Sequence, residues 1–272
     1  MSDLANLKES VREFWNAKSC GEVYAEGADL RARLETQAEA RYQLEAYLKP
    51  FANYPSGAGR DVLEIGVGMG ADHLEWAKSQ PRTLTGVDLT ERAIEFTQAR
   101  LALYGLNSEL RVADAENLPF ADNSFDIVYS YGVLHHSPDT ARAIREAHRV
   151  LRPGGVAKIM IYHSRSIVGY MLWTRYALLG LKPLTPLRDI YANYLESPGT
   201  KAFTVQQARG LFAPFLSAKF EICLEPGDLI EGAVGQRHGG LALRAAKAVW
   251  PRGLIRKTMG NHGLGMLITA VK

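Results

Sequence analysis

The chain has 272 residues, of which 47% are hydrophobic and 22% are charged, and its formal net charge is +3. This length can bury one full core with additions, or one domain with a small cap. Two cysteines, Cys20 and Cys223, exclude a disulfide framework and a cysteine-built metal site. The longest apolar run, residues 167–181, contains Arg175 and falls short of the roughly 20 residues that cross a bilayer. We therefore expect a cytoplasmic protein with neither a signal segment nor a transmembrane segment.

Two helices are predicted before the first strand. Apolar residues recur at helical spacing over residues 3–17, and a second such segment covers residues 28–49 and ends before Pro50. The sequence PSGAG at 55–59 is a boundary signal. Residues 1–55 are therefore expected to form a helical cap over one edge of a site in the following domain.

The central segment joins a buried strand to a glycine-rich turn. Residues 62–65 are mainly apolar, and Gly66, Gly68 and Gly70 follow directly, before a helix over residues 71–78. A strand, a turn without side chains and a helix N-terminus let a ligand lie against bare backbone. The spacing G-x-G-x-G differs from the G-x-G-x-x-G of dinucleotide-binding proteins, and a tight turn without a ligand remains the alternative.

Strands and helices then alternate along the chain. Strand character is found at 83–88, 109–114, 125–130 and 156–162, and the helices between these segments begin near Thr90 and Ser137. Such alternation predicts an α/β fold with a doubly wound, mostly parallel sheet whose ligand lies at the C-terminal ends of the strands. Asp88 ends its strand 22 residues after Gly66 (88 − 66), a position from which a carboxylate can accept hydrogen bonds from ribose hydroxyls.

Four motifs in this order resemble the class I S-adenosylmethionine-dependent methyltransferases, in particular the small-molecule group that includes the quinone-biosynthesis methyltransferases. They are VLEIGVGMG at 62–70, GVDLT at 86–90, VADAENLPFADNSFDIVYSYGVLHHSPD at 112–139 and EAHRVLRPGG at 146–155. The resemblance implies a Rossmann-like sheet of seven strands, mostly parallel with an antiparallel last strand, and S-adenosyl-L-methionine as the cofactor.

The resemblance also implies which residues bind that cofactor. The methionine half would lie against Glu64, Gly66, Gly68 and Gly70, with Tyr129 and Ser130 closing its side. Asp88 would hold the ribose hydroxyls and Leu89 would lie against the adenine, whose amino group would donate to Asp114 beside Ala115. Strand-end carboxylates suit a cationic ligand that also carries hydroxyl and amino donors.

The histidines are the candidates for acid–base chemistry. His135 and His136 are adjacent, unlike the i, i+4 pair with which a helix presents metal ligands, so no metal site is predicted. Of the two, we expect His135 to face the site. The catalytic candidates are His135, Tyr162 and His163, and a base is needed only where the nucleophile carries a proton of high pKa.

The remainder of the chain is expected to choose the substrate. The core, residues 56–163, is followed by an inserted cap at 164–203, whose aromatic helix over 167–181 would offer Tyr170 and Trp173 to the substrate. Residues 204–272 would end the sheet with strands at 220–224 and 266–271, paired antiparallel. Between these strands lies an unusually long insertion, residues 228–264.

The C-terminal part of the chain is basic. From residue 232 to 272 there are seven Lys or Arg and no acid, so the first 231 residues sum to −4 (3 − 7). We expect Arg237 and His238 to bind an anionic, partly apolar substrate. Peripheral contact of this basic part with a membrane is a second possibility. A basic face that is simply solvated is the alternative.

Two classes of function follow from the sequence. The first is methyl transfer from S-adenosylmethionine to an oxygen, nitrogen or carbon of a small molecule. The second is a methyltransferase-fold protein that binds the cofactor without methyl transfer, or that transfers another group from it. Nucleic acid and protein substrates are disfavoured, because SYGV at 130–133 stands where amide methyltransferases carry an N-P-P-Y-type motif.

Overall fold

The fold is a seven-stranded sheet flanked by helices. The computed structural model describes residues 3–232 and 247–272. The strands are β1 (Asp61–Ile65), β2 (Thr83–Asp88), β3 (Glu109–Val112), β4 (Phe125–Tyr131), β5 (Leu151–Tyr162), β6 (Ser217–Cys223) and β7 (Gly265–Val271). Their order in the sheet is β3-β2-β1-β4-β5-β7-β6, and β7 runs antiparallel to both of its neighbours. The predicted Rossmann-like sheet, with its antiparallel last strand, is confirmed.

Helices surround the sheet and the ends of its strands. They are α1 (Asp3–Ala17), α2 (Leu30–Leu44), α3 (Leu48–Ala52), α4 (Ala71–Lys78), α5 (Glu91–Leu103), α6 (Thr140–Val150), α7 (Ile167–Trp173), α8 (Leu187–Tyr194), α9 (Val205–Leu211) and α11 (Arg252–Thr258). Short turns are η1 (Glu22–Tyr24), η2 (Tyr54–Gly57) and η4 (Gly260–His262), and the π-helical η3 (Thr174–Leu178) continues α7. In the described ranges, no helix is long and apolar enough to span a membrane.

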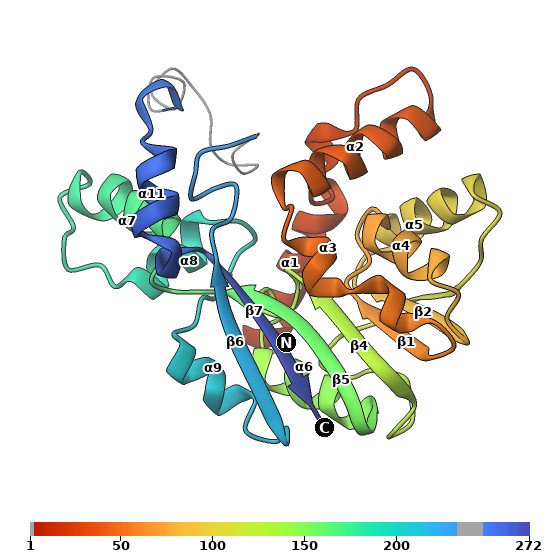
Figure 1. The fold of residues 1–272 in the computed structure, drawn as a ribbon. Coiled ribbons are helices and arrows are strands. Elements are labelled where there is room, and N and C mark those ends of the chain that lie inside the picture. The colour runs from red at the N-terminus through yellow and green to blue at the C-terminus, as the bar shows by residue number, and fades with distance from the viewer. Residues whose placement is uncertain (1–2, 233–246) are drawn as a thin grey trace.

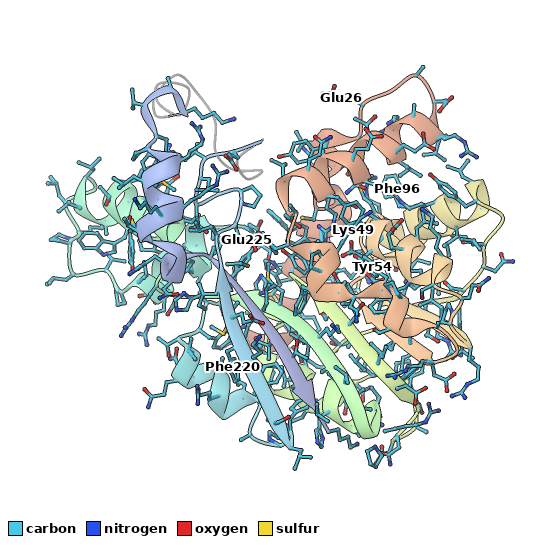
Figure 2. All side chains as sticks on the ribbon, in the orientation of Figure 1. Glu26, Lys49, Tyr54, Phe96, Phe220 and Glu225 are labelled. Carbon is cyan, nitrogen blue, oxygen red and sulfur yellow. The ribbon has the colours of Figure 1, made fainter. Side chains whose placement is uncertain are left out.

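Two apolar layers hold the sheet. On one face α6 and α9 pack against it through residues such as Ile144 and Phe212, which are almost fully buried. On the other face α3 and α4 form a layer around Trp76, whose ring lies edge-on to those of Tyr54 and Tyr129. Figure 1 shows α2 and α3 beside α4 and α5 on one side of the strand ends, with α7, α8 and α11 on the other side. Figure 2 labels Tyr54 in the first of these groups and Glu225 just beyond the end of β6.

The N-terminal helices differ from the prediction at one point. The segment 28–49 was expected to be one helix that ends before Pro50, but α2 ends at Leu44 and Pro50 lies inside α3. Pro50 is the third residue of α3, in the first turn, where a backbone N–H has no partner within the helix, so proline is tolerated there. Whether residues 1–55, 56–163, 164–203 and 204–272 are separate domains stays a prediction.

Candidate active site

The glycine turn after β1 packs closely against Val133 and Thr97. Gly66 has φ +84°, and a Cβ built there would come within 2.1 Å of a Val133 methyl group. Gly70 has φ +74°, caps the N-terminus of α4, and would meet Thr97 at 2.8 Å. Any larger residue at these two positions would be strained in φ and would collide, so glycine is required by the close approach of the β4 and α5 segments. The turn therefore presents bare backbone to the space beyond β1.

Carboxylates stand at the ends of β2 and just after β3, as predicted. Asp88 accepts hydrogen bonds from Gly68 N (3.1 Å), Thr90 N (3.0 Å) and Thr90 Oγ1 (2.9 Å). Burial raises the pKa of Asp88, and these donors oppose that rise. Asp114 is engaged by the first helix, because Lys8 Nζ lies 2.6 Å from its Oδ2 and 2.6 Å from Glu116 Oε2.

One cavity of about 870 Å³ joins these elements, and this volume lies in the upper part of the usual range of about 300–1,000 Å³ for small-molecule sites. Of the predicted cofactor residues it is lined by Glu64, Gly66, Gly68, Asp88, Leu89, Asp114 and Ala115. The opposite wall comes from α7, the loop before α9 and the segment after β6. The cavity thus lies between the N-terminal helices and the inserted cap, and it has room for a second molecule beside a nucleotide-like ligand.

Three predicted cofactor residues do not line the cavity: Gly70, which caps α4, and Tyr129 and Ser130 of β4. Ser130 is fully buried and donates to Ile65 O (2.9 Å), and Tyr129 is fully buried and donates to Asp72 Oδ2 (2.8 Å) in the α3–α4 layer. Along β4 the side chains alternate between the faces, and Tyr129 lies too deep to reach the strand end. Tyr131, two residues further on the same face, lines the cavity instead.

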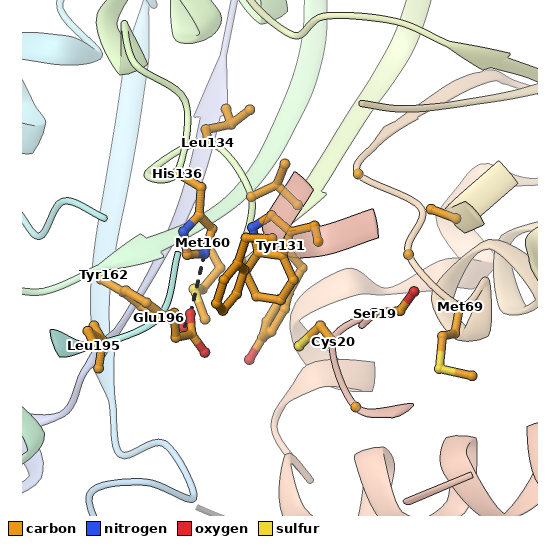
Figure 3. A pocket seen from close by; sticks show the side chains of 18 of the residues that line it. Ser19, Cys20, Met69, Tyr131, Leu134, His136, Met160, Tyr162, Leu195 and Glu196 are labelled. Carbon is orange, nitrogen blue, oxygen red and sulfur yellow. Dashed lines mark hydrogen bonds and ion pairs between the residues drawn. The ribbon is translucent and has the colours of Figure 1, made fainter. Parts of the chain in front are cut away.

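The histidine nearest the cavity is His136, which corrects the prediction for His135. His136 Nδ1 lies 2.8 Å from Ser197 Oγ, and its Nε2 lies 3.3 Å from Glu196 Oε2. The hydroxyl of Tyr162 donates to the same Glu196 oxygen at 2.7 Å. Figure 3 shows His136, Tyr162 and Glu196 together on the cavity wall, with Tyr131 beside them. We call these three residues the His136–Glu196–Tyr162 cluster.

The two histidines that were predicted to be catalytic, His135 and His163, are both buried. His135 is fully buried, its ring lies 3.8 Å from that of Tyr162 between centroids and is tilted by 34°, and burial lowers its pKa well below the usual value. His163 Nδ1 lies 3.2 Å from Gly263 O, and burial also lowers the pKa of this ring. Neither histidine lines the cavity, which differs from the expected placement of His135 facing the site.

A metal ion could be held by one group within the described ranges. His135, His136 and Glu196 each place a potential ligand atom within 4.8 Å of the others. Glu196 and His136 have hydrogen-bond partners without an ion, since Tyr162 and Ser197 contact them. The absence of a metal stays a prediction.

The aromatic residues predicted to bind substrate face away from the cavity. Tyr170 OH lies 2.9 Å from His262 Nδ1, and Trp173 Nε1 donates to Thr185 O at 3.1 Å. The cavity-facing side of this helix carries Val168, Met171, Leu172 and Arg175, at positions i, i+3, i+4 and i+7. Arg237 and His238, predicted to bind an anionic group, lie outside the described residues.

Two buried polar groups in the cavity wall were not anticipated from the sequence. Arg41 of α2 makes two hydrogen bonds to Asp72 at the start of α4 (3.2 and 2.8 Å), and its guanidinium lies 5.0 Å from the centre of the Tyr131 ring. Glu225 lies 3.4 Å from Tyr131 OH, and burial, helped by the charge of Glu45, raises its pKa to about 8. No local pattern could have revealed them, because their partners are distant in sequence.

The strand order, the glycine turn at the end of β1 and the carboxylates at the next two strand ends define the class I S-adenosylmethionine-dependent methyltransferase fold. Residues 63–159 match the family model described as "Methyltransferase domain". This part of the chain is therefore a methyltransferase domain of that class.

Known relatives and solved structures agree with this assignment. The chain is 40% identical over 105 residues to 27-O-demethylrifamycin SV methyltransferase of Amycolatopsis mediterranei, covering 37% of this chain and 38% of the relative. It is 38% identical over 179 residues to phthiotriol/phenolphthiotriol dimycocerosates methyltransferase 1 of Mycobacterium ulcerans, covering 65% of this chain and 58% of the relative. The alignments therefore span between about two fifths and three fifths of these relatives.

The structural neighbours share the fold at low sequence identity. The putative methyltransferase in complex with the Haloferax volcanii Trm112 activator has a TM-score of 0.59 at 17% identity, with 96% of each chain covered. Haemonchus contortus phosphoethanolamine N-methyltransferase 2, solved with S-adenosylhomocysteine, has a TM-score of 0.57 at 18% identity, with 90% of this chain and 60% of that chain covered.

Proposed function

We propose that this protein transfers a methyl group from S-adenosylmethionine to an oxygen or nitrogen of a small molecule. The observation that carries the proposal is the single cavity that holds both the glycine turn and the His136–Glu196–Tyr162 cluster. Two partly similar proteins are named as methyltransferases of a rifamycin and of phthiotriol-type compounds, which supports a small-molecule substrate.

The residues of the cavity fit such a cofactor. Gly68 lines the cavity with φ +52°, and nothing lies within 4 Å of a Cβ built there, so the turn leaves its backbone open to a ligand at this residue. Asp88 offers carboxylate oxygens to ribose hydroxyls, and Leu89 and Ala115 offer apolar surface to an adenine. Asp114 could accept from an adenine amino group while it keeps its contact with Lys8, since each carboxylate oxygen has two lone pairs.

When bound, S-adenosylmethionine would supply an electrophilic methyl group, and its sulfur would keep the electron pair of the broken bond as a neutral thioether. The chain's own part would be alignment of the nucleophile and removal of its proton. His136 Nε2 and Glu196 Oε2 are 3.3 Å apart, and Tyr162 donates to that same oxygen, so Tyr162 fixes the carboxylate beside the imidazole. A proton from a hydroxyl or amine would pass to this His136–Glu196 pair.

The test is a cofactor-consumption screen over phenols, quinone precursors, amines, alcohols and acidic sugars. With a substrate in hand, His136→Gln and Glu196→Gln should each lower kcat by about 10²–10⁴-fold, the usual contribution of a general base. Calorimetry should show that both variants bind S-adenosylhomocysteine with the same affinity as the wild type. His163→Gln is the matched control, because His163 is buried outside the cavity, and it should keep wild-type turnover.

Two results would contradict the proposal. If calorimetry shows NAD bound and S-adenosylmethionine ignored, the cofactor assignment is wrong. If both glutamine variants turn over like the wild type, the His136–Glu196 pair is not the base. A protein that binds the cofactor but methylates nothing in the panel would instead favour the binding function without methyl transfer.

A further inference from the structure

Several apolar side chains of the inserted cap and of the segment before β7 are exposed to solvent. Their exposed fractions are 47% for Leu178, 73% for Leu179, 89% for Leu181, 93% for Leu184, 80% for Val249 and 61% for Leu254. Figure 1 shows α7 and α11 side by side, and a groove of about 510 Å³ is lined by residues of both, including Leu179 and Leu254. We call these six residues the leucine surface.

The backbone at the centre of this surface is held in a conformation that leucine disfavours. Leu181 has φ +57°, and it closes the end of η3 through Leu181 N→Leu178 O (3.1 Å) and Lys182 N→Ala177 O (2.8 Å). Glycine or asparagine is usual at such a left-handed helix end. In water, an asparagine at position 181 would relieve both the strain and the exposure of apolar surface. A leucine here is therefore better suited to an apolar environment outside the protein.

The charges around the leucine surface are mainly basic. Segments 167–194 and 247–264 together hold seven Lys or Arg and one acid, Asp189, which pairs with Arg188. Arg252 and Arg256 both approach Glu231. Lys182 and Lys257 are exposed, and no ion pair is recorded for either within 3–232 and 247–272. Exposed leucines among unneutralised basic side chains are typical of a surface that meets anionic lipid headgroups.

We propose that the leucine surface docks on the anionic face of a lipid bilayer. A second copy of the chain fits less well, because a twofold interface would bring the same basic side chains of both copies together. The leucines of residues 181 and 184 are the most exposed of the set and could enter the headgroup region.

The leucine surface also adjoins the cavity. Met171 and Arg175 line both the cavity and the groove between α7 and α11. A partly apolar molecule could therefore pass from the bilayer to the cavity along these two residues. Only this route rests on the proposed methyl transfer; docking itself does not require it.

The docking is tested by co-sedimentation of the full chain with vesicles. Vesicles of phosphatidylcholine and phosphatidylglycerol in equal parts should bind the protein, and phosphatidylcholine alone should bind it much less. The variant Leu181→Asn/Leu184→Asn keeps the net charge and should lower the partition coefficient by about tenfold or more. Lys182→Gln/Lys257→Gln should lower it by about fivefold for each charge, with a weaker salt dependence than the wild type.

The matched control is Leu216→Asn, since Leu216 is 84% exposed but precedes β6 at the other end of the sheet. It should bind like the wild type. The proposal is overturned if the wild type ignores anionic vesicles, or if the Leu181/Leu184 variant binds them unchanged. It is also overturned if the wild type is a dimer in sedimentation that this variant dissociates, because the surface would then join two copies. All of these readouts are independent of methyl transfer.

Discussion

Asp228 holds three parts of the cavity wall, and its replacement tests this arrangement. It is fully buried, and its carboxylate accepts hydrogen bonds from Val168 N (3.1 Å), Glu225 N (2.9 Å) and Leu264 N (2.7 Å). These three residues line the cavity and come from α7, from the loop after β6 and from the approach to β7. The first residue of the basic insertion is therefore a structural support and not a substrate contact.

The expected loss of stability follows from the three donors. In Asp228→Ala each of the three buried N–H groups loses its acceptor. An unsatisfied buried donor costs about 1–3 kcal/mol, and this cost is smaller where a water molecule enters and accepts the hydrogen bond. We expect the free energy of unfolding to fall by about 3–5 kcal/mol. In Asp228→Asn the amide oxygen can replace one carboxylate oxygen, so the loss should be about 1–2 kcal/mol.

Urea denaturation followed by tryptophan fluorescence measures this effect. Trp250 is a suitable reporter, because its Nε1 donates to the Asp228 carbonyl at 3.0 Å. The control is Asp122→Ala, because the exposed Asp122 carboxylate forms a surface ion pair with Arg149 (2.8 Å) and its loss should change stability by less than about 1 kcal/mol. If Asp228→Ala is within about 1 kcal/mol of the wild type, the backbone donors do not depend on this carboxylate and the reasoning fails.

Two further predictions concern carboxylates in the cavity. Asp88→Ala should weaken binding of S-adenosylhomocysteine by about 1.5–3 kcal/mol in calorimetry, because the ribose loses a charged acceptor; unchanged affinity would place the ribose elsewhere. Burial raises the pKa of Glu225 to about 8, so the folded state keeps a proton that the unfolded state releases near pH 4.3. Stability should therefore fall as pH rises between these values, by up to about 1.4 kcal/mol per pH unit, and Glu225→Gln should flatten the slope. Equal slopes of unfolding free energy against pH in both proteins would refute this.

The elements around the glycine turn could be predicted because their signals are local. The segments 71–78 and 83–88 have the predicted bounds, since a buried strand, positive-φ glycines and a helix follow one another within a short stretch. The same locality placed Asp88 at the cavity. The last residue of a parallel strand lies at the edge of the sheet where the ligand binds, so the position of Asp88 in the sequence was enough to predict its place at the cavity.

Site residues could not be located from the sequence where the position along the chain does not set the direction of the side chain. Residues 132–139 follow β4 without a regular period, so nothing in the sequence chose between His135 and His136. In the helix that begins at Ile167, Tyr170 and Trp173 are predicted to contact the substrate because they are aromatic. Their positions along the helix place them on other faces than Val168, which lines the cavity. Glu196 was missed because its partners are joined to it only by the tertiary fold.

Charged contacts help to hold α1 and α2 over the cavity. α2 buries only Leu34 and Gln37, and α1 only Val11, which is little apolar surface with which to hold two helices of 15 residues. Two of the charged contacts of these helices are with Asp72 and Asp114, both of which line the cavity. A ligand that changes the hydrogen bonds of these carboxylates must change the hold on the helices, and by linkage the position of the helices must change the affinity for that ligand. We therefore expect ligand binding and the positions of α1 and α2 to be coupled through Asp72 and Asp114.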